Sequence, residues 1–362
     1  MKTPRICFVL PLAVTAISLI GSMGRAAVLL DDDWDDGDRT DTNLPEESAW
    51  FASNAISTPT LSAAVGALIG NVRIFETNAG SRLWITHFTP AGVPVELGIG
   101  DALKVTAVFT VNNVAAAPGT ARGLRIGLFN FSEPGAARVS GDGFSTGSGG
   151  GAPGVNVTGY GVNMNFAQTI TTASPLQIIK RTDLATNNLM GASAVFATLG
   201  AGGGASGTPG FASGVPYTFE FSVTRDASGV GILARFKDGA EWSVFHSVTD
   251  TANPTFRFDG FAIRPNSAAD TADTFTFSRF KVELIPFEVR IVGAEFPSPE
   301  GFKLTWSTLP GRSYRVEWRS NLLDSVEWSP VGSVVADGST ASLSDIEAFF
   351  DPRRFYRVVE LP

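Results

Sequence analysis

The chain has 362 residues, 44% of them hydrophobic, and a formal net charge of −8 at pH 7. No cluster of Lys and Arg interrupts this acidity, which argues against nucleic acid and anionic membrane surfaces as partners. The single cysteine, Cys7, lies close to the N-terminus, so the rest of the chain has no disulfide, thiolate metal ligand or cysteine nucleophile. A chain of this length buries a core without disulfides and favours two domains.

The first segment is typical of a secretory signal peptide. Lys2 and Arg5 precede an uncharged apolar run over residues 6–20, and small residues precede a cleavage site after Ala26. This order indicates export, because a membrane-spanning helix needs about 20 apolar residues. We therefore expect residues 1–26 to be a signal peptide and the protein to be secreted, periplasmic or displayed at the cell surface. No later stretch is long and apolar enough to predict a membrane span.

A dense acidic segment follows, with the sequence DDDWDDGDRTDTNLPEESAWF. Calcium prefers about six to eight oxygen ligands, many of them carboxylates from one loop. The spacing departs from that of an EF-hand, because Trp34 stands where a ligand would be. A solvated acidic cap is the alternative. Trp34 and Trp50 offer apolar anchors, so we expect Asp31–Asp41 to stay close to the folded domain. The candidate ligands of a structural calcium ion are Asp33, Asp35, Asp36 and Asp38.

Short strands with period-two alternation dominate the next part of the chain. Tyr217–Thr224 alternates apolar and polar side chains, and Thr274–Leu284 does so with one slip near Arg279. Leu61–Asn71 is ambiguous, but its two glycines favour a strand over a helix. Further strands are expected at Arg82–Phe88, Ala102–Val111, Gly123–Phe131, Gly159–Phe166, Leu176–Arg181, Val230–Lys237, Trp242–Val248 and Phe256–Arg264.

Two glycine-rich segments, Gly141–Gly159 and Gly200–Gly214, are predicted to be mobile surface connections. Neither contains the GK[ST] sequence that a phosphate-binding loop needs.

A domain boundary is predicted near Pro286, because proline removes a backbone donor and interrupts a strand. The domains are then 27–285 and 286–362. The second has strands at the spacing of a small β-sandwich, with Trp306, Trp318 and Trp328 expected in its core. Its strands are predicted at Val289–Phe296, Gly301–Trp306, Ser313–Trp318, Trp328–Val335, Ala341–Leu343 and Phe355–Val359.

The acidic opening and the segments ITHFTP, LGIGDALKVTAVF, GLRIGLFN, GYGVNMNF, YTFEFSVTRD and FDGFAIRPN resemble secreted bacterial proteins with a concanavalin A-like (laminin-G-like) jelly-roll domain. The tail GRSYRVEWRSNLLDSVEW…FYRVVEL is similar to the fibronectin type III-like modules of such proteins, often in Verrucomicrobia and Planctomycetes. This resemblance implies an all-β fold, a large antiparallel jelly-roll sandwich followed by a small fibronectin III-like β-sandwich. It implies no particular ligand, because the fold hosts lectins, lyases, glycosidases and inert spacers.

No catalytic set is visible. The two histidines, His87 and His246, lie in strands among apolar or hydroxyl neighbours. Retaining glycosidases need two carboxylates about 5–5.5 Å apart, and no E-x-D-x-E arrangement occurs. The strand LQIIKR matches the Gln-Ile of alginate-lyase-like proteins at Gln177, but Ile179 stands where their histidine would be. Catalysis is therefore not the leading hypothesis.

Carbohydrate binding requires aromatic platforms beside hydrogen-bonding side chains. Burial in the sandwich core is the alternative for each aromatic residue. The leading hypothesis is an exported, non-catalytic protein that binds a polysaccharide, a cell-surface glycan or another surface. The alternatives are a polysaccharide lyase or glycoside hydrolase with a site built from loops, and an envelope-structural or adhesive component without a small ligand. The candidate ligand-binding residues are Trp84, Tyr160, Asn163, Asn165 and Trp242.

Overall fold

The computed structural model describes residues 26–53, 60–73, 81–116, 122–145, 153–191, 193–296, 301–322, 327–350 and 354–361. In these ranges the chain is all-β, with strands and two short 3-10 helices and no α-helix, as the sequence predicts. One compact unit covers Arg25–Pro286 and a second includes Phe287–Pro362. The predicted signal peptide lies almost entirely outside the described residues. No helix in the described part of the chain is long and apolar enough to cross a membrane.

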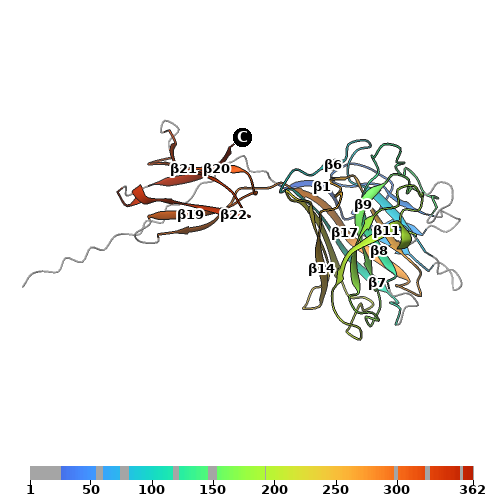
Figure 1. Ribbon diagram of the computed structural model, residues 1–362. Helices are drawn as coiled ribbons and strands as arrows, with labels where there is room; N and C mark the ends of the chain where they lie inside the picture. Colours follow the sequence, from blue (N-terminus) through green and yellow to red (C-terminus); the bar gives the residue numbers. More distant parts are fainter. Residues whose placement is uncertain are drawn as a thin grey trace, which may run out of the picture. The chain divides into compact units, whose positions relative to one another are not determined.

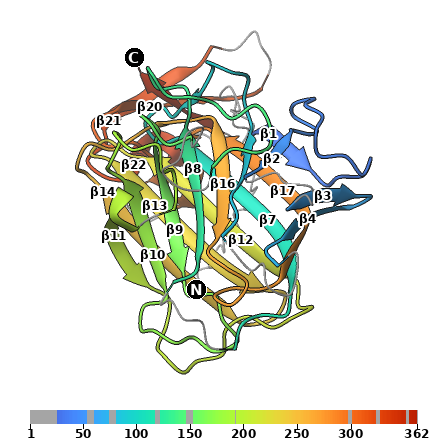
Figure 2. The ribbon, with the colours of Figure 1, turned by 90° about the vertical axis from the view of Figure 1, so that its right-hand side faces the viewer.

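The first sheet of the larger unit is antiparallel and has the strand order β14-β13-β12-β7-β17-β4-β3, with β1 also paired to β17 (Figure 2). Alternate residues of β12 are buried, which confirms the period-two prediction. A register shift in β17 between Phe277 and Arg279 confirms the predicted slip. The strands are β1 (Ala27–Asp32), β3 (Leu61–Ala64), β4 (Ala67–Asn71), β7 (Ala102–Asn112), β12 (Tyr217–Arg225), β13 (Val230–Asp238), β14 (Ser243–Asp250) and β17 (Thr274–Ile285).

The second sheet is also antiparallel, with the order β11-β10-β9-β8-β16-β5-β2. It packs face to face on the first sheet, and together they form the expected jelly-roll sandwich (Figure 1). Two short strands, β6 (Val95–Glu96) and β15 (Arg257–Phe258), pair with each other. The strands of the second sheet are β2 (Trp50–Ala52), β5 (Trp84–His87), β8 (Leu124–Asn130), β9 (Thr158–Met164), β10 (Leu176–Arg181), β11 (Phe196–Gly202) and β16 (Gly260–Pro265).

Strand β11 corrects the sequence prediction, which placed Gly200–Gly202 in a mobile loop. The strand lies against β14 of the other sheet (Figure 2). A β-carbon on Gly200 or Gly202 would stand 2.7 or 2.5 Å from the ring of His246 on β14. Glycine is needed here because the His246 ring lies directly on the β11 backbone, a close approach that only glycine permits.

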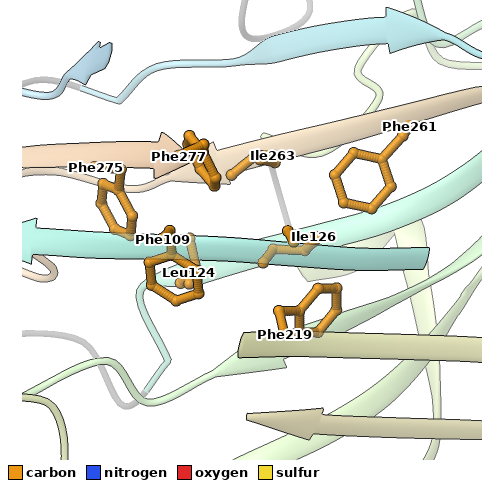
Figure 3. Close-up of a pocket in the computed structure, with 9 residues that line it drawn as sticks. Phe109, Leu124, Ile126, Phe219, Phe261, Ile263, Phe275 and Phe277 are labelled. Atoms are coloured by element: carbon orange, nitrogen blue, oxygen red, sulfur yellow. The ribbon is translucent and has the colours of Figure 1, made fainter. Parts of the chain in front are cut away.

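The space between the two sheets is filled by aliphatic and aromatic side chains. Figure 3 shows Phe109, Phe219, Phe261 and Phe275 around a cavity of about 10 Å³ whose lining is entirely apolar. A cavity needs about 10–15 Å³ and several polar partners to hold a water molecule, so this one stays dry. Around these residues the interior is therefore a packed core.

The outer face of the second sheet is partly covered by loops. Phe129 of β8 and Ile85 of β5 form a second apolar cluster with Phe144, Val157 and Met190, which come from the covering segments. Phe144 and Val157 belong to the glycine-rich stretch that we predicted to be mobile. The described ends of that stretch are instead packed on the sheet, because these two apolar side chains anchor them.

The smaller unit consists of two three-stranded antiparallel sheets, β18-β19-β22 and β21-β20-β23. Trp306 is buried in its core with Tyr314, as predicted. Trp328 is only half-buried and lies outside the core cluster, which corrects the prediction; the guanidinium groups of Arg319 and Arg357 each lie 4.4 Å from its ring centroid. The strands are β18 (Ile291–Glu295), β19 (Phe302–Ser307), β20 (Ser313–Arg319), β21 (Ser329–Val335), β22 (Thr340–Asp345) and β23 (Phe355–Leu361).

Candidate functional site

The acidic segment is folded against the sandwich. Trp34 is 2% exposed, and its ring centroid lies 6.3 Å from that of Trp50. This confirms that the segment is anchored by its tryptophans. Beside them, burial raises the pKa of the Asp32 carboxyl to about 7, while hydrogen bonds from the backbone of Trp34 and Ser48 act in the opposite direction.

The four candidate calcium ligands are all exposed. Asp38 Oδ1 accepts hydrogen bonds from the backbone nitrogen and the hydroxyl of Thr40, at 2.6 and 2.8 Å, so it closes a local turn. Asp36 Oδ1 likewise accepts one from the Asp38 nitrogen, at 2.8 Å. Within the described ranges no three His, Cys, Asp or Glu side chains are grouped to hold a metal ion. Calcium binding by Asp33, Asp35, Asp36 and Asp38 stays a prediction.

Trp84 and Tyr160 lie inside the sandwich, where neither ring is accessible to a sugar. The Tyr160 hydroxyl donates to Asp250 Oδ2 at 2.7 Å and accepts from the Thr255 nitrogen at 2.9 Å. Burial, together with the hydrogen bond to Asp250, raises the pKa of Tyr160. Both residues are therefore part of the core, which was the alternative for each of them.

Trp242 and Asn165 also have structural roles. The Trp242 ring packs edge-on against Phe211 and Tyr217, and its Nε1 donates to the Pro209 carbonyl at 3.0 Å. Asn165 Oδ1 accepts from the Thr171 nitrogen at 2.8 Å and so closes the turn after β9. The structure does not bring these two residues together with Asn163.

Asn163 lies in a polar pocket of about 410 Å³ on the outer face of the second sheet. This volume falls in the range of small-molecule sites, about 300–1,000 Å³. The apolar part of the lining is Ile179 and Phe196. The polar part comes from five segments of the chain and consists of Arg122, Arg125, Asn163, Gln177, Ser193, Thr198 and Asn266.

Strand register explains why these side chains meet. Arg125 on β8 stands opposite Asn163 on β9, which stands opposite Gln177 on β10. Directly opposite residues in a sheet share a face. Leu124 and Ile126 point into the core, so period-two alternation turns Arg125 outward. One row of polar side chains therefore crosses three strands.

The row continues on β16, where Arg264 stands opposite Arg125. Arg125 is 8% exposed and Arg264 is 6% exposed. Arg125 donates to the Met190 carbonyl at 2.7 Å and to Ser193 Oγ at 2.8 Å. Burial lowers the pKa of Arg264 to about 10, and the charge of Arg125 adds to this shift. Even so, both guanidinium groups remain charged at neutral pH.

Neither histidine lies in this pocket. His87 is buried beside Phe131, and its Nε2 lies 3.1 Å from the Val139 carbonyl. Burial lowers the pKa of His87 to about 3, with the charge of Arg138 acting in the same direction. The ring is therefore neutral at physiological pH, so it does not act as a general acid there, and its Nε2–H donates to the Val139 carbonyl.

The sequence analysis found Asn163 but not the arginines beside it. The signal was present as a single charged residue inside two apolar runs, GLRIGLF and GFAIRP. An arginine in a strand that is otherwise buried on both faces needs a partner or a function.

No protein-family model matches the chain, and no curated protein matches it. Solved structures to which it has some likeness include peanut lectin with a 9mer peptide, at 11% identity and a TM-score of 0.35 over 67% of this chain and 100% of that one. Another is the VIP36 exoplasmic/lumenal domain in its Ca2+/Man3GlcNAc-bound form, at 12% identity and a TM-score of 0.38 over 67% and 87%. A third is an endo-1,3-beta-glucanase from Streptomyces sioyaensis, at 14% identity and a TM-score of 0.39 over 75% and 100%. At identities and TM-scores this low, the similarity indicates no ligand, metal or activity for this chain. The fold is assigned from the sheet topology of the chain itself.

Proposed function

We propose that this protein is an exported, non-catalytic glycan-binding protein and that the pocket around Asn163 is its binding site. The observation that carries this is the row Arg125, Asn163 and Gln177 across three strands, inside a hollow of about 410 Å³. Amide and guanidinium groups offer several donors and acceptors at fixed angles, which suits the adjacent hydroxyls of a sugar. Phe196 supplies an apolar edge for a C–H face. Export rests on the signal-like sequence of residues 1–26.

The composition of the pocket supports binding over catalysis. The described residues that line it include no Asp, Glu, His, Tyr or Lys. The arginines are poor general bases because guanidinium keeps its proton at physiological pH. A polysaccharide lyase or glycoside hydrolase would need a base or a pair of carboxylates from elsewhere. That enzyme remains the alternative proposal, and an adhesive or envelope-structural protein is the other. The smaller unit is proposed to serve as a spacer or docking module.

Affinity electrophoresis of residues 27–362 in gels containing plant, algal or microbial polysaccharides tests the proposal. We expect at least one polymer to retard the protein, and Asn163→Leu to abolish the retardation. Ser222→Leu, on the outer face of the other sheet, is the matched control and should leave it unchanged. If no polymer retards the protein, the glycan-binding proposal fails and the structural alternative stands. Release of reducing or unsaturated sugar ends would instead identify the enzyme.

A further inference from the structure

Two buried arginines face each other in the second sheet. Arg125 on β8 and Arg264 on β16 are directly opposite partners in an antiparallel pair, and both side chains are more than nine-tenths buried. Like charges directly opposite each other destabilise a sheet. Removing a charge from water without an opposite charge is also costly. This arrangement therefore lowers the stability of the protein as long as nothing neutralises it.

The partners of these guanidinium groups are all neutral. Arg264 Nη2 donates to Ser81 Oγ at 3.0 Å, and Arg122 Nη2, at the edge of the same pocket, donates to the Ser174 carbonyl at 2.9 Å. Across the described ranges, no Asp or Glu forms an ion pair with Arg122, Arg125 or Arg264. The Nε atoms of these three arginines also have no hydrogen-bond partner among the described residues.

Arg181 and Arg354 show the two ordinary ways in which this fold satisfies the terminal nitrogens of a guanidinium group, although the Nε atom of each also has no partner among the described residues. Arg181 donates four hydrogen bonds to the carbonyls of Gly154, Thr186, Asn188 and Leu189, at 2.6–3.0 Å, and so holds a loop. Arg354 forms an ion pair with Asp345 at 2.6 Å. The pocket arginines have neither a full set of carbonyls nor a carboxylate, although the fold uses both solutions elsewhere.

The pocket also contains an unused acceptor. Asn163 is 9% exposed, and its Nδ2 donates weakly to Gln177 Oε1 at 3.4 Å. Its Oδ1 has no partner among the described residues. Buried polar atoms are almost always hydrogen-bonded, to protein, to ordered water or to a ligand. A bound sugar hydroxyl would supply the missing donor.

We infer that the pocket takes an acidic sugar, with the carboxylate or sulfate of the sugar bound by Arg122 and Arg125 and its ring hydroxyls bound by Asn163 and Gln177. This rests on the proposed glycan-binding function and narrows its ligand class. Arginine suits such a group because its planar donors match the oxygens of an oxyanion. The anion also neutralises the repulsion between Arg125 and Arg264, so part of the binding free energy comes from relieving the cost of that pair.

Matched polymers that differ only in charge test the ligand class. Polygalacturonate is compared with its fully methyl-esterified and its carboxyl-reduced forms, and dextran sulfate with dextran. We expect the affinity for polygalacturonate or for dextran sulfate to be at least about tenfold higher than that for its neutral counterpart. A factor of this size corresponds to the free energy of one charge-assisted hydrogen bond. The polymer that shows this difference tells whether the anion is carboxylate or sulfate. Raising the salt concentration should weaken the binding of the acidic polymer and leave the binding of the neutral polymer unchanged.

Two arginine substitutions locate the effect. Arg122→Gln should lower the affinity for the acidic polymer about tenfold, and by more than it lowers the affinity for the neutral counterpart. Arg257→Gln makes the same change of charge at a side chain that is 46% exposed, on β15, and should have no effect. Arg125→Lys, checked for an unchanged fold by circular dichroism, keeps the charge but loses the planar donors and should also weaken binding.

The outcomes separate the two proposals. Equal binding of acidic and neutral polymers, or equal effects of Arg122→Gln and Arg257→Gln, would overturn the acidic-sugar inference and leave glycan binding standing. Absence of binding to every polymer, neutral or acidic, would overturn both.

Discussion

Gly70 on β4 lies against the indole of Trp84 on β5, so closely that a β-carbon on Gly70 would stand 2.4 Å from the Cη2 atom of Trp84. The two strands belong to different sheets. Trp84 thus reaches across the core and meets bare backbone on the other side. A side chain larger than that of glycine at position 70 would therefore collide with the indole ring.

Gly70→Ala is expected to lower the free energy of unfolding by about 1–3 kcal/mol, because the added methyl group overpacks the core against a rigid ring. Chemical denaturation monitored by tryptophan fluorescence measures this. Gly239→Ala is the control, since a β-carbon there would meet no atom within 4 Å. It should change stability by no more than about 0.5 kcal/mol. Equal effects of the two substitutions would show that the Trp84 contact does not limit packing.

Stability is expected to fall as the pH rises from about 4 to about 7. The pKa of Asp32 is about 7 in the folded protein and 3.8 in the unfolded reference, so the folded state holds a proton that the unfolded state has lost. Its contribution is therefore fully present below pH 4 and lost as the pH passes through about 7. Burial also raises the pKa of Asp259, which acts in the same direction.

Asp32→Asn isolates the Asp32 contribution. The melting temperature of the unsubstituted protein should fall more between pH 5 and pH 8 than that of the variant. Asp35→Asn, an exposed neighbour, should keep the full pH dependence. The same pH dependence in all three proteins would show that Asp32 does not titrate in this range.

Calcium at millimolar concentration is expected to raise the melting temperature by a few degrees relative to chelator. The pKa of Glu47 is raised by burial and by the charges of Asp36 and Asp41, which shows that the carboxylates of this segment repel one another. A bound cation would remove that repulsion. Asp35→Asn combined with Asp36→Asn should erase the difference, whereas magnesium serves as a control for general screening. Superimposable melting curves in calcium and chelator would leave the segment a solvated acidic cap.

Asp345→Ala is expected to destabilise the smaller unit by about 3–5 kcal/mol. Asp345 Oδ2 accepts from Arg354 at 2.6 Å and from the Tyr356 hydroxyl at 2.9 Å, so its removal leaves a buried guanidinium with only the exposed Glu347, 3.9 Å away, as counter-charge. Calorimetry should show that the smaller unit of this variant unfolds at a lower temperature than in the unsubstituted protein. Glu360→Gln breaks a half-exposed ion pair with Arg312 and should change the unfolding temperature of this unit little. A shift of the same size in both variants would contradict this account.

Much of the fold was predictable from local pattern. Alternation in Tyr217–Thr224 set which side chains are buried, and the slip near Arg279 is the register shift of β17. Leu61–Asn71, expected to be extended, forms the hairpin of β3 and β4. The prediction missed that Gly200–Gly202 is a strand, because glycine content signals a loop unless the side chain that lies on it is known. Here that side chain is His246, which is 44 residues further along the chain than Gly202.

The sequence by itself determined the all-β class and the inward-facing side chains of strands that alternate, such as Tyr217–Thr224, because side-chain direction follows from position in a strand. It also predicted the anchoring of the acidic segment by its tryptophans. Only the tertiary structure decided which aromatic residues are core and which polar residues meet. Arg125 and Arg264 are 139 residues apart in the chain, and their opposition depends on β8 and β16 being neighbours in one register. Strand order and register arise from the packing of the whole sandwich, which no local pattern contains.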